Sequence, residues 1–74
     1  MLRVTLLQGA QRVFSGTAAQ VVLPGEEGDV AVLDFHAPML CALRTGALEI
    51  DDARFAVRGG LARVAKNVVT IVTP

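Results

Sequence analysis

The side chains that could carry out catalysis are few in this sequence. It contains one serine, Ser15, one histidine, His36, and one cysteine, Cys41. Ser15 as nucleophile, His36 as base and an aspartate would make a hydrolase triad, but such a triad also needs an oxyanion hole beside it. A chain of this length has little concavity in which to build one. We therefore expect Ser15 to lie in a strand-end turn, no catalytic residues and no enzymatic activity.

The same side chains decide whether a metal could bind. Zinc sites use three or four Cys, His or carboxylate ligands, and only His36 and Cys41 could supply nitrogen or sulfur here. Asp34 and His36 are two positions apart in a turn, a spacing that is common by chance. Neither a phosphate-binding P-loop pattern nor a dinucleotide fingerprint occurs. The sequence therefore predicts no metal and no cofactor.

An acidic turn and a histidine turn could instead contact a partner. Glu26, Glu27 and Asp29 lie beside the glycines of the turn and form either a solvated loop or an electrostatic docking loop for a basic surface. His36 alone is typical of a turn residue that donates to a nearby carbonyl group. The Ala37-Pro38 pair that follows it restricts the backbone, so the position of His36 is firmly directed.

The segment after this turn is apolar on both faces. Met39, Leu40 and Cys41 begin a run that is either a strand buried on two sides or a strand with one face covered by a partner. The sequence alone leaves both alternatives open.

Composition limits the class of protein. Seventy-four residues allow one domain, and the seven basic and seven acidic side chains cancel. The chain has no basic patch and no Trp or Tyr on which bases could stack, so we expect no nucleic-acid partner. One cysteine excludes an intramolecular disulfide. No uncharged run approaches the length of a membrane span, so any membrane association would go through a membrane protein.

Alternation of apolar and polar residues predicts short strands with one buried face. Pro24-Gly25, Asp51-Asp52 and Lys66-Asn67 supply the turns, and Gly59-Gly60 marks a bend. The chain is expected to be all-β, one small β-sandwich or flattened barrel of about nine to ten short strands over residues 1–74. The expected strands are Leu2–Gln8, Arg12–Ser15, Ala18–Leu23, Val30–Leu33, Met39–Leu43, Ala47–Ile50, Arg54–Val57, Leu61–Ala65 and Val68–Val72.

The order of these motifs resembles the β-sandwich domain of the epsilon subunit of the rotary F-type ATP synthase. The matching segments read V-F-S-G at 13–16, V-L-P-G-E-E-G-D-V-A-V-L at 22–33, H-A-P-M-L at 36–40, G-A-L-E-I at 46–50, F-A-V-R-G-G-L at 55–61 and N-V-V-T-I-V at 67–72. Each motif is weak by itself, but the ordered set covers nearly the whole chain. The family pattern has Pro-Gly where this chain has Asp34-Phe35, and Phe35 would be strained if that glycine has a positive φ angle.

The resemblance implies a non-catalytic rotor subunit in the central stalk of a proton- or sodium-translocating ATP synthase. Such a domain couples the gamma subunit to the membrane rotor ring of c subunits, here at the cytoplasmic face of a bacterial inner membrane. It has no direct membrane insertion, and we expect no C-terminal helical hairpin in this chain. The resemblance places Glu26, Glu27, Gly28, Asp29 and His36 against the rotor ring, and Met39, Leu40 and Cys41 against gamma.

A second hypothesis comes from another class of protein. Swinging-arm carrier domains of the lipoyl or biotinyl kind are flattened β-barrels of similar size with a modified lysine at a hairpin tip, and Lys66 is expected at such a tip. The Ala65-Lys66-Asn67 setting lacks the usual Met-Lys-Met or Asp-Lys-Ala surroundings. This tip also lies near the C-terminus, which disfavours the carrier hypothesis.

Overall fold

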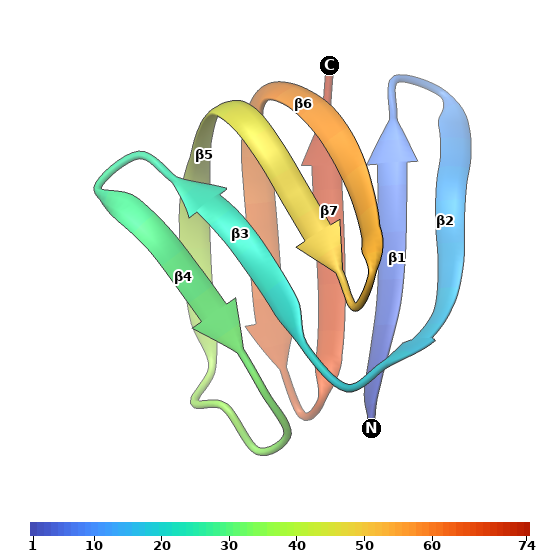
Figure 1. Cartoon of the computed structure of the whole chain (residues 1–74), viewed down its shortest axis with the longest axis vertical. Coiled ribbons are helices and arrows are strands. Elements are labelled where there is room, and N and C mark those ends of the chain that lie inside the picture. The colour runs from blue at the N-terminus through green and yellow to red at the C-terminus, as the bar shows by residue number, and fades with distance from the viewer.

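The chain is all-β, as the alternation predicted. Figure 1 shows the computed structural model, which describes all residues from 1 to 74. The chain has seven strands and no helix. No helix long and apolar enough to cross a membrane is therefore present. The strands are β1 (Leu2–Gln8), β2 (Gln11–Ala18), β3 (Val21–Gly25), β4 (Gly28–Val32), β5 (Met39–Ile50), β6 (Ala53–Ala65) and β7 (Val68–Thr73).

All seven strands belong to one sheet that folds over itself. Their order is β2-β1-β7-β6-β5-β3-β4, and every pair is antiparallel except β1 with β7. The long β5–β6 hairpin runs through both layers of the fold (Figure 1). The start of β5 and the end of β6 lie with β7, β1 and β2, while the other halves lie with β3 and β4. The expected sandwich is confirmed.

Glycines bend β6 where it passes from one layer to the other. Gly59 and Gly60 have φ angles of 91° and 123°. A Cβ atom on Gly60 would lie 2.2 Å from the carbonyl oxygen of Val72, so only glycine lets β7 pair this closely. The bend changes which positions of β6 point inward. Val57 is buried before it and Ala62 after it, so inward residues have odd numbers before the bend and even numbers after it. Both halves of β6 therefore face one core.

The number of strands differs from the expectation because two pairs of expected strands are continuous. Met39–Leu43 and Ala47–Ile50 are parts of β5, and Arg54–Val57 and Leu61–Ala65 are parts of β6. The β5–β6 ladder continues on both sides of the bend. Gly59 and Gly60 turn the backbone of β6 without ending the strand, and Gly46 of β5 stays in the ladder opposite Val57, which composition alone does not reveal.

One apolar core fills the space between the layers. The first strand shows the expected period of two, since Leu2, Val4 and Leu6 are all buried. On one side of the sandwich, Phe14 of β2 meets Phe55 of β6 edge to face, with ring centroids 5.9 Å apart. The core comprises Leu2, Val4, Leu6, Ala18, Val21, Leu23, Val32, Cys41, Leu43, Leu48, Ile50, Val57, Ala62, Val64, Val69 and Ile71.

Candidate docking site

The acidic turn joins β3 to β4 and is built on two glycines. Gly25 pairs with Gly28, so Glu26 and Glu27 form a two-residue tip and both side chains are exposed. A Cβ on Gly25 would come within 2.6 Å of the carbonyl oxygen of Gly28 and within 3.2 Å of Sγ of Cys41. Glycine at 25 therefore lets the turn lie directly against β5.

Arg44 of β5 fixes the base of this turn. Its Nη1 donates to the carbonyl oxygen of Gly25 and its Nη2 to Oδ1 of Asp29, each at 2.7 Å. The charge of Asp29 is thus balanced within the chain, whereas Glu26 and Glu27 form no ion pair. The two glutamates are the carboxylates left free to attract a basic partner.

A groove of about 330 Å³ separates the acidic turn from the start of β5. It brings together residues that the sequence analysis assigned to two different partners. Its apolar side includes Leu40, which is 67% exposed, and Cys41, which is 8% exposed. The lining residues are Gly25, Glu26, Glu27, Gly28, Asp29, Val30, Met39, Leu40, Cys41 and Ala42.

The strand at the start of β5 has one buried and one exposed face. Cys41 and Leu43 point into the core, while Leu40 and Ala42 are exposed. The sequence left open whether this apolar segment is buried on both faces or exposed on one. In the structure one of its faces is exposed.

The thiol of Cys41 lies at the boundary between this groove and the core. Burial raises the pKa of the thiol above its ordinary value of 9.0, and the negative charge of Glu26 raises it further. The thiol consequently stays protonated at neutral pH and is a poor nucleophile. Cys41 contributes packing to the site rather than reactivity.

The structure places His36 away from the other four residues expected at the rotor ring. It follows β4, whereas the acidic turn precedes β4, and the two turns lie at opposite ends of that strand (Figure 1). His36 is half-buried and does not line the groove. Its Nδ1 lies 2.7 Å from the carbonyl oxygen of Ala37, to which it donates. This agrees with the expected turn histidine that donates to a nearby carbonyl group.

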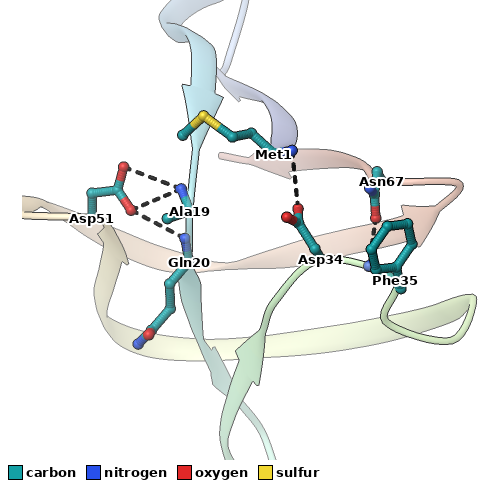
Figure 2. A network of polar contacts seen from close by, with 7 residues as sticks. All are labelled: Met1, Ala19, Gln20, Asp34, Phe35, Asp51 and Asn67. Carbon is teal, nitrogen blue, oxygen red and sulfur yellow. Dashed lines mark hydrogen bonds and ion pairs between the residues drawn. The ribbon is translucent and has the colours of Figure 1, made fainter.

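The turn around His36 is held by two contacts from distant parts of the chain. Figure 2 shows the N-terminal amine of Met1 beside Asp34 and the amide of Phe35 donating to Oδ1 of Asn67. The first contact measures 3.2 Å and the second 2.7 Å. Phe35 has a φ angle of 65°, so the backbone strain expected at this position is present. Asn67 was not expected as the partner of Phe35, although its position in a turn was predicted.

The remaining candidates for chemistry are not assembled into a site. Ser15 lies within β2 rather than in a strand-end turn, and no hydrogen bond joins it to His36. β2 and β4 are the two end strands of the sheet order. Lys66 is exposed at the tip between β6 and β7, where it was expected.

Comparison with known proteins decides the family. Residues 1–74 match the family described as "ATP synthase, Delta/Epsilon chain, beta-sandwich domain". The chain belongs to this family. The resemblance found in the sequence is confirmed, and the family replaces the carrier-domain hypothesis for Lys66.

Curated relatives of the chain are ATP synthase epsilon chains. That of Maricaulis maris is 40% identical over 75 residues, covering 96% of this chain and 56% of its own length. That of Janthinobacterium sp. is 35% identical over 77 residues, covering 96% of this chain and 55% of its own. The chain thus spans a little over half the length of these epsilon chains.

Solved structures share the same fold. A chain in the Euglena gracilis mitochondrial ATP synthase structure "OSCP/F1/c-ring in rotational state 1" superposes with a TM-score of 0.90 at 25% identity, over 97% of this chain and 49% of its own. A chain in the Tetrahymena thermophila "central stalk/cring" structure gives 0.76 at 20% identity, over 97% and 62%. The second likeness shows the fold alone.

Proposed function

We propose that this chain is the sandwich domain of a non-catalytic central-stalk subunit that couples the gamma subunit to the membrane rotor ring of a proton- or sodium-translocating ATP synthase. The observation that carries the proposal is the acidic turn. It presents Glu26 and Glu27 unpaired at the rim of the single concave site of the structure. Carboxylates at a rim steer and orient a basic partner, which suits a coupling part better than a catalyst.

The contacts follow the two walls of this site. The ring contact comprises Glu26, Glu27, Gly28 and Asp29, with His36 at a separate position beyond β4. The gamma contact comprises Met39, Leu40 and Cys41, of which Leu40 offers the most exposed apolar surface. Since the bacterial relatives are epsilon chains, we place the domain at the cytoplasmic face of the inner membrane, held there through the ring.

Reconstitution with the gamma subunit and the ring of the same organism tests this proposal. We expect size-exclusion chromatography with mass detection to give a one-to-one complex with gamma, and sedimentation with the purified ring to give a ring complex. Glu27→Lys should weaken ring binding about tenfold, a difference of about 1.4 kcal/mol. Its matched control, Asp52→Lys, makes the same charge change on another exposed two-residue turn and should bind normally. A folded chain that binds neither intact partner would refute the proposal.

A further inference from the structure

The first residues of β5 form an open strand edge inside the groove. Met39–Ala42 pair with β6 on one side, and none of them pairs with β3, whose nearest partner in β5 is Leu43. On the open side, the amide of Glu26 donates to the carbonyl oxygen of Ala42 at 2.9 Å. No strand lies beside the residues that precede Ala42, so this edge has room for another one.

The backbone of Leu40 points toward that edge. Backbone polar groups of successive residues in a strand alternate between its two sides, so residues two apart face the same neighbour. The carbonyl of Ala42 faces Glu26 rather than β6, and the register from Met39 to Leu43 is unbroken. The N–H and C=O of Leu40 therefore both face the groove. They offer one donor and one acceptor to an added strand.

The surroundings of this edge select the chemistry of an added strand. The groove has apolar side chains on its β5 side and the free carboxylates of Glu26 and Glu27 at its rim. Arg44, the cation beside the acidic turn, is occupied by Gly25 and Asp29, and Arg63 lies opposite Leu40 on β6. An apolar side chain can thus be buried in the groove, and a basic one beside it meets an unbalanced negative charge.

We propose that the groove binds an extended segment of a partner protein by strand addition at Leu40, with a basic side chain next to an apolar one in that segment. Strand addition takes affinity from main-chain hydrogen bonds and specificity from alternate side chains. Pro38 lacks an N–H and ends the available ladder, which sets the register. A second copy of this chain is disfavoured because pairing groove to groove would bring the glutamates of both copies together.

This inference rests on the proposed function, since the segment is supplied by a stalk partner, and it makes that function more specific. The residues assigned to the ring and to gamma lie on two walls of one groove. One segment lying along Leu40 would contact both walls at once. That segment would lie where the ring contact and the gamma contact meet.

Peptide probes test the groove without any stalk protein. The basic probe is acetyl-Arg-Val-Arg-Val-Arg-Val-amide, and the acidic control has Glu in place of Arg. Amide hydrogen exchange of the labelled chain is followed by NMR. We expect the basic peptide at millimolar concentration to slow exchange at Leu40 at least about tenfold and the acidic peptide to leave it unchanged. No protection by the basic peptide, or equal protection by both, overturns the inference, as does dimerisation of the chain through this edge.

Two changes separate the main chain from the side chain. Leu40→Pro removes the N–H of residue 40. Proline is compatible with this edge position because that N–H does not pair with β6. Leu40→Ala shortens the side chain and keeps the N–H. We expect Leu40→Pro to weaken the peptide about tenfold and Leu40→Ala less than about threefold. The reverse order overturns strand addition. Should Leu40→Pro unfold, a basic peptide with N-methylated valines makes the same test, and its undiminished binding overturns the inference.

Co-purification with gamma and the ring keeps this test separate from that of the function. A chain that binds either stalk protein but not the basic peptide retains the proposed function and loses the strand-addition site. A chain that binds the basic peptide with protection at Leu40 but neither stalk protein retains the site and loses the proposed function.

Discussion

The backbone amide of Phe35 donates a hydrogen bond to Oδ1 of Asn67 across 2.7 Å and so joins the turn before β5 to the turn between β6 and β7. Both residues have positive φ angles, 65° and 60°. Asparagine tolerates this conformation, whereas it costs most other residues about 1–2 kcal/mol. The side chain of Phe35 is 90% exposed, so packing offsets little of this cost.

Replacing Phe35 by glycine should therefore stabilise the fold. We expect Phe35→Gly to raise the free energy of unfolding by about 1 kcal/mol and Tm by about 4–8 °C, measured by urea and thermal unfolding. Ala37→Gly is the control, because Ala37 has no positive φ to relieve, and it should lower stability by up to about 1 kcal/mol. A less stable Phe35→Gly protein would show that the exposed ring does pack.

The strain at Phe35 could be predicted from the sequence, but its partner could not. Asp34-Phe35 stands where the family pattern has Pro-Gly, and the resemblance implied strain at Phe35 if that glycine has a positive φ angle. Asn67 lies 32 positions away, and only the pairing of β6 with β7 brings it alongside. The groove could likewise be predicted only in part. The acidic and apolar segments were each recognised, while their meeting depends on the folding of the whole sheet.

The bend at Gly60 should be highly sensitive to substitution. Gly60→Ala would place Cβ 2.2 Å from the carbonyl oxygen of Val72 at a φ angle of 123°. Overpacking and backbone strain together should cost about 3 kcal/mol or more, enough to unfold a small domain. Gly9→Ala is the matched control, since its φ is also positive but nothing lies within 4 Å of the added atom. The contrast is measured by circular dichroism and urea unfolding, and equal losses would contradict a steric role for Gly60.

The charge of Glu26 should slow the reaction of the Cys41 thiol. Burial raises the pKa of that thiol most, and the negative charge of Glu26 raises it further. Glu27 does not contribute to this shift of the pKa. Glu26→Gln should therefore increase the fraction of thiolate and speed alkylation by iodoacetamide at pH 8. Glu27→Gln makes the same change one residue away and should leave the rate as it is. An equal acceleration by both variants would indicate opening of the groove instead.

Stability should also fall at high pH because of this thiol. Burial raises its folded-state pKa above 9.0, so unfolding releases a proton once the pH exceeds that value. The contribution is fully present below pH 9 and is lost as the pH rises toward the folded-state pKa. Cys41→Ala should flatten the dependence of unfolding free energy on pH above 9, as urea titrations at several pH values would show. An unchanged slope would assign the alkaline loss to other groups.

Strand positions were easier to predict than strand continuity. β1 has the expected bounds because Leu2, Val4 and Leu6 alternate without interruption. β5 and β6 were each divided at glycines, which end many strands but lie within these two. Whether a glycine ends or bends a strand depends on the neighbouring ladder, here β6 beside β5, and a single sequence does not contain that information.

Asp51, in the turn between β5 and β6, binds the connection between β2 and β3 and provides a last test. The carboxylate of Asp51 accepts hydrogen bonds from the amides of Ala19 and Gln20 (Figure 2). Its Oδ1 lies 3.0 Å from each nitrogen. Asp52 makes no such contact.

Asp51→Ala should therefore lower the free energy of unfolding by about 1–2 kcal/mol, because two amides lose a charged acceptor and alanine is strained at the φ angle of 51°. Asp51→Asn keeps an Oδ1 acceptor and tolerates that conformation, so it should lose less than half as much. Asp52→Ala should stay within about 0.5 kcal/mol of the unchanged chain in urea unfolding. Equal losses at the two positions would mean that the hairpin tip is stabilised by turn propensity alone and that the link from Asp51 to the β2–β3 connection adds nothing.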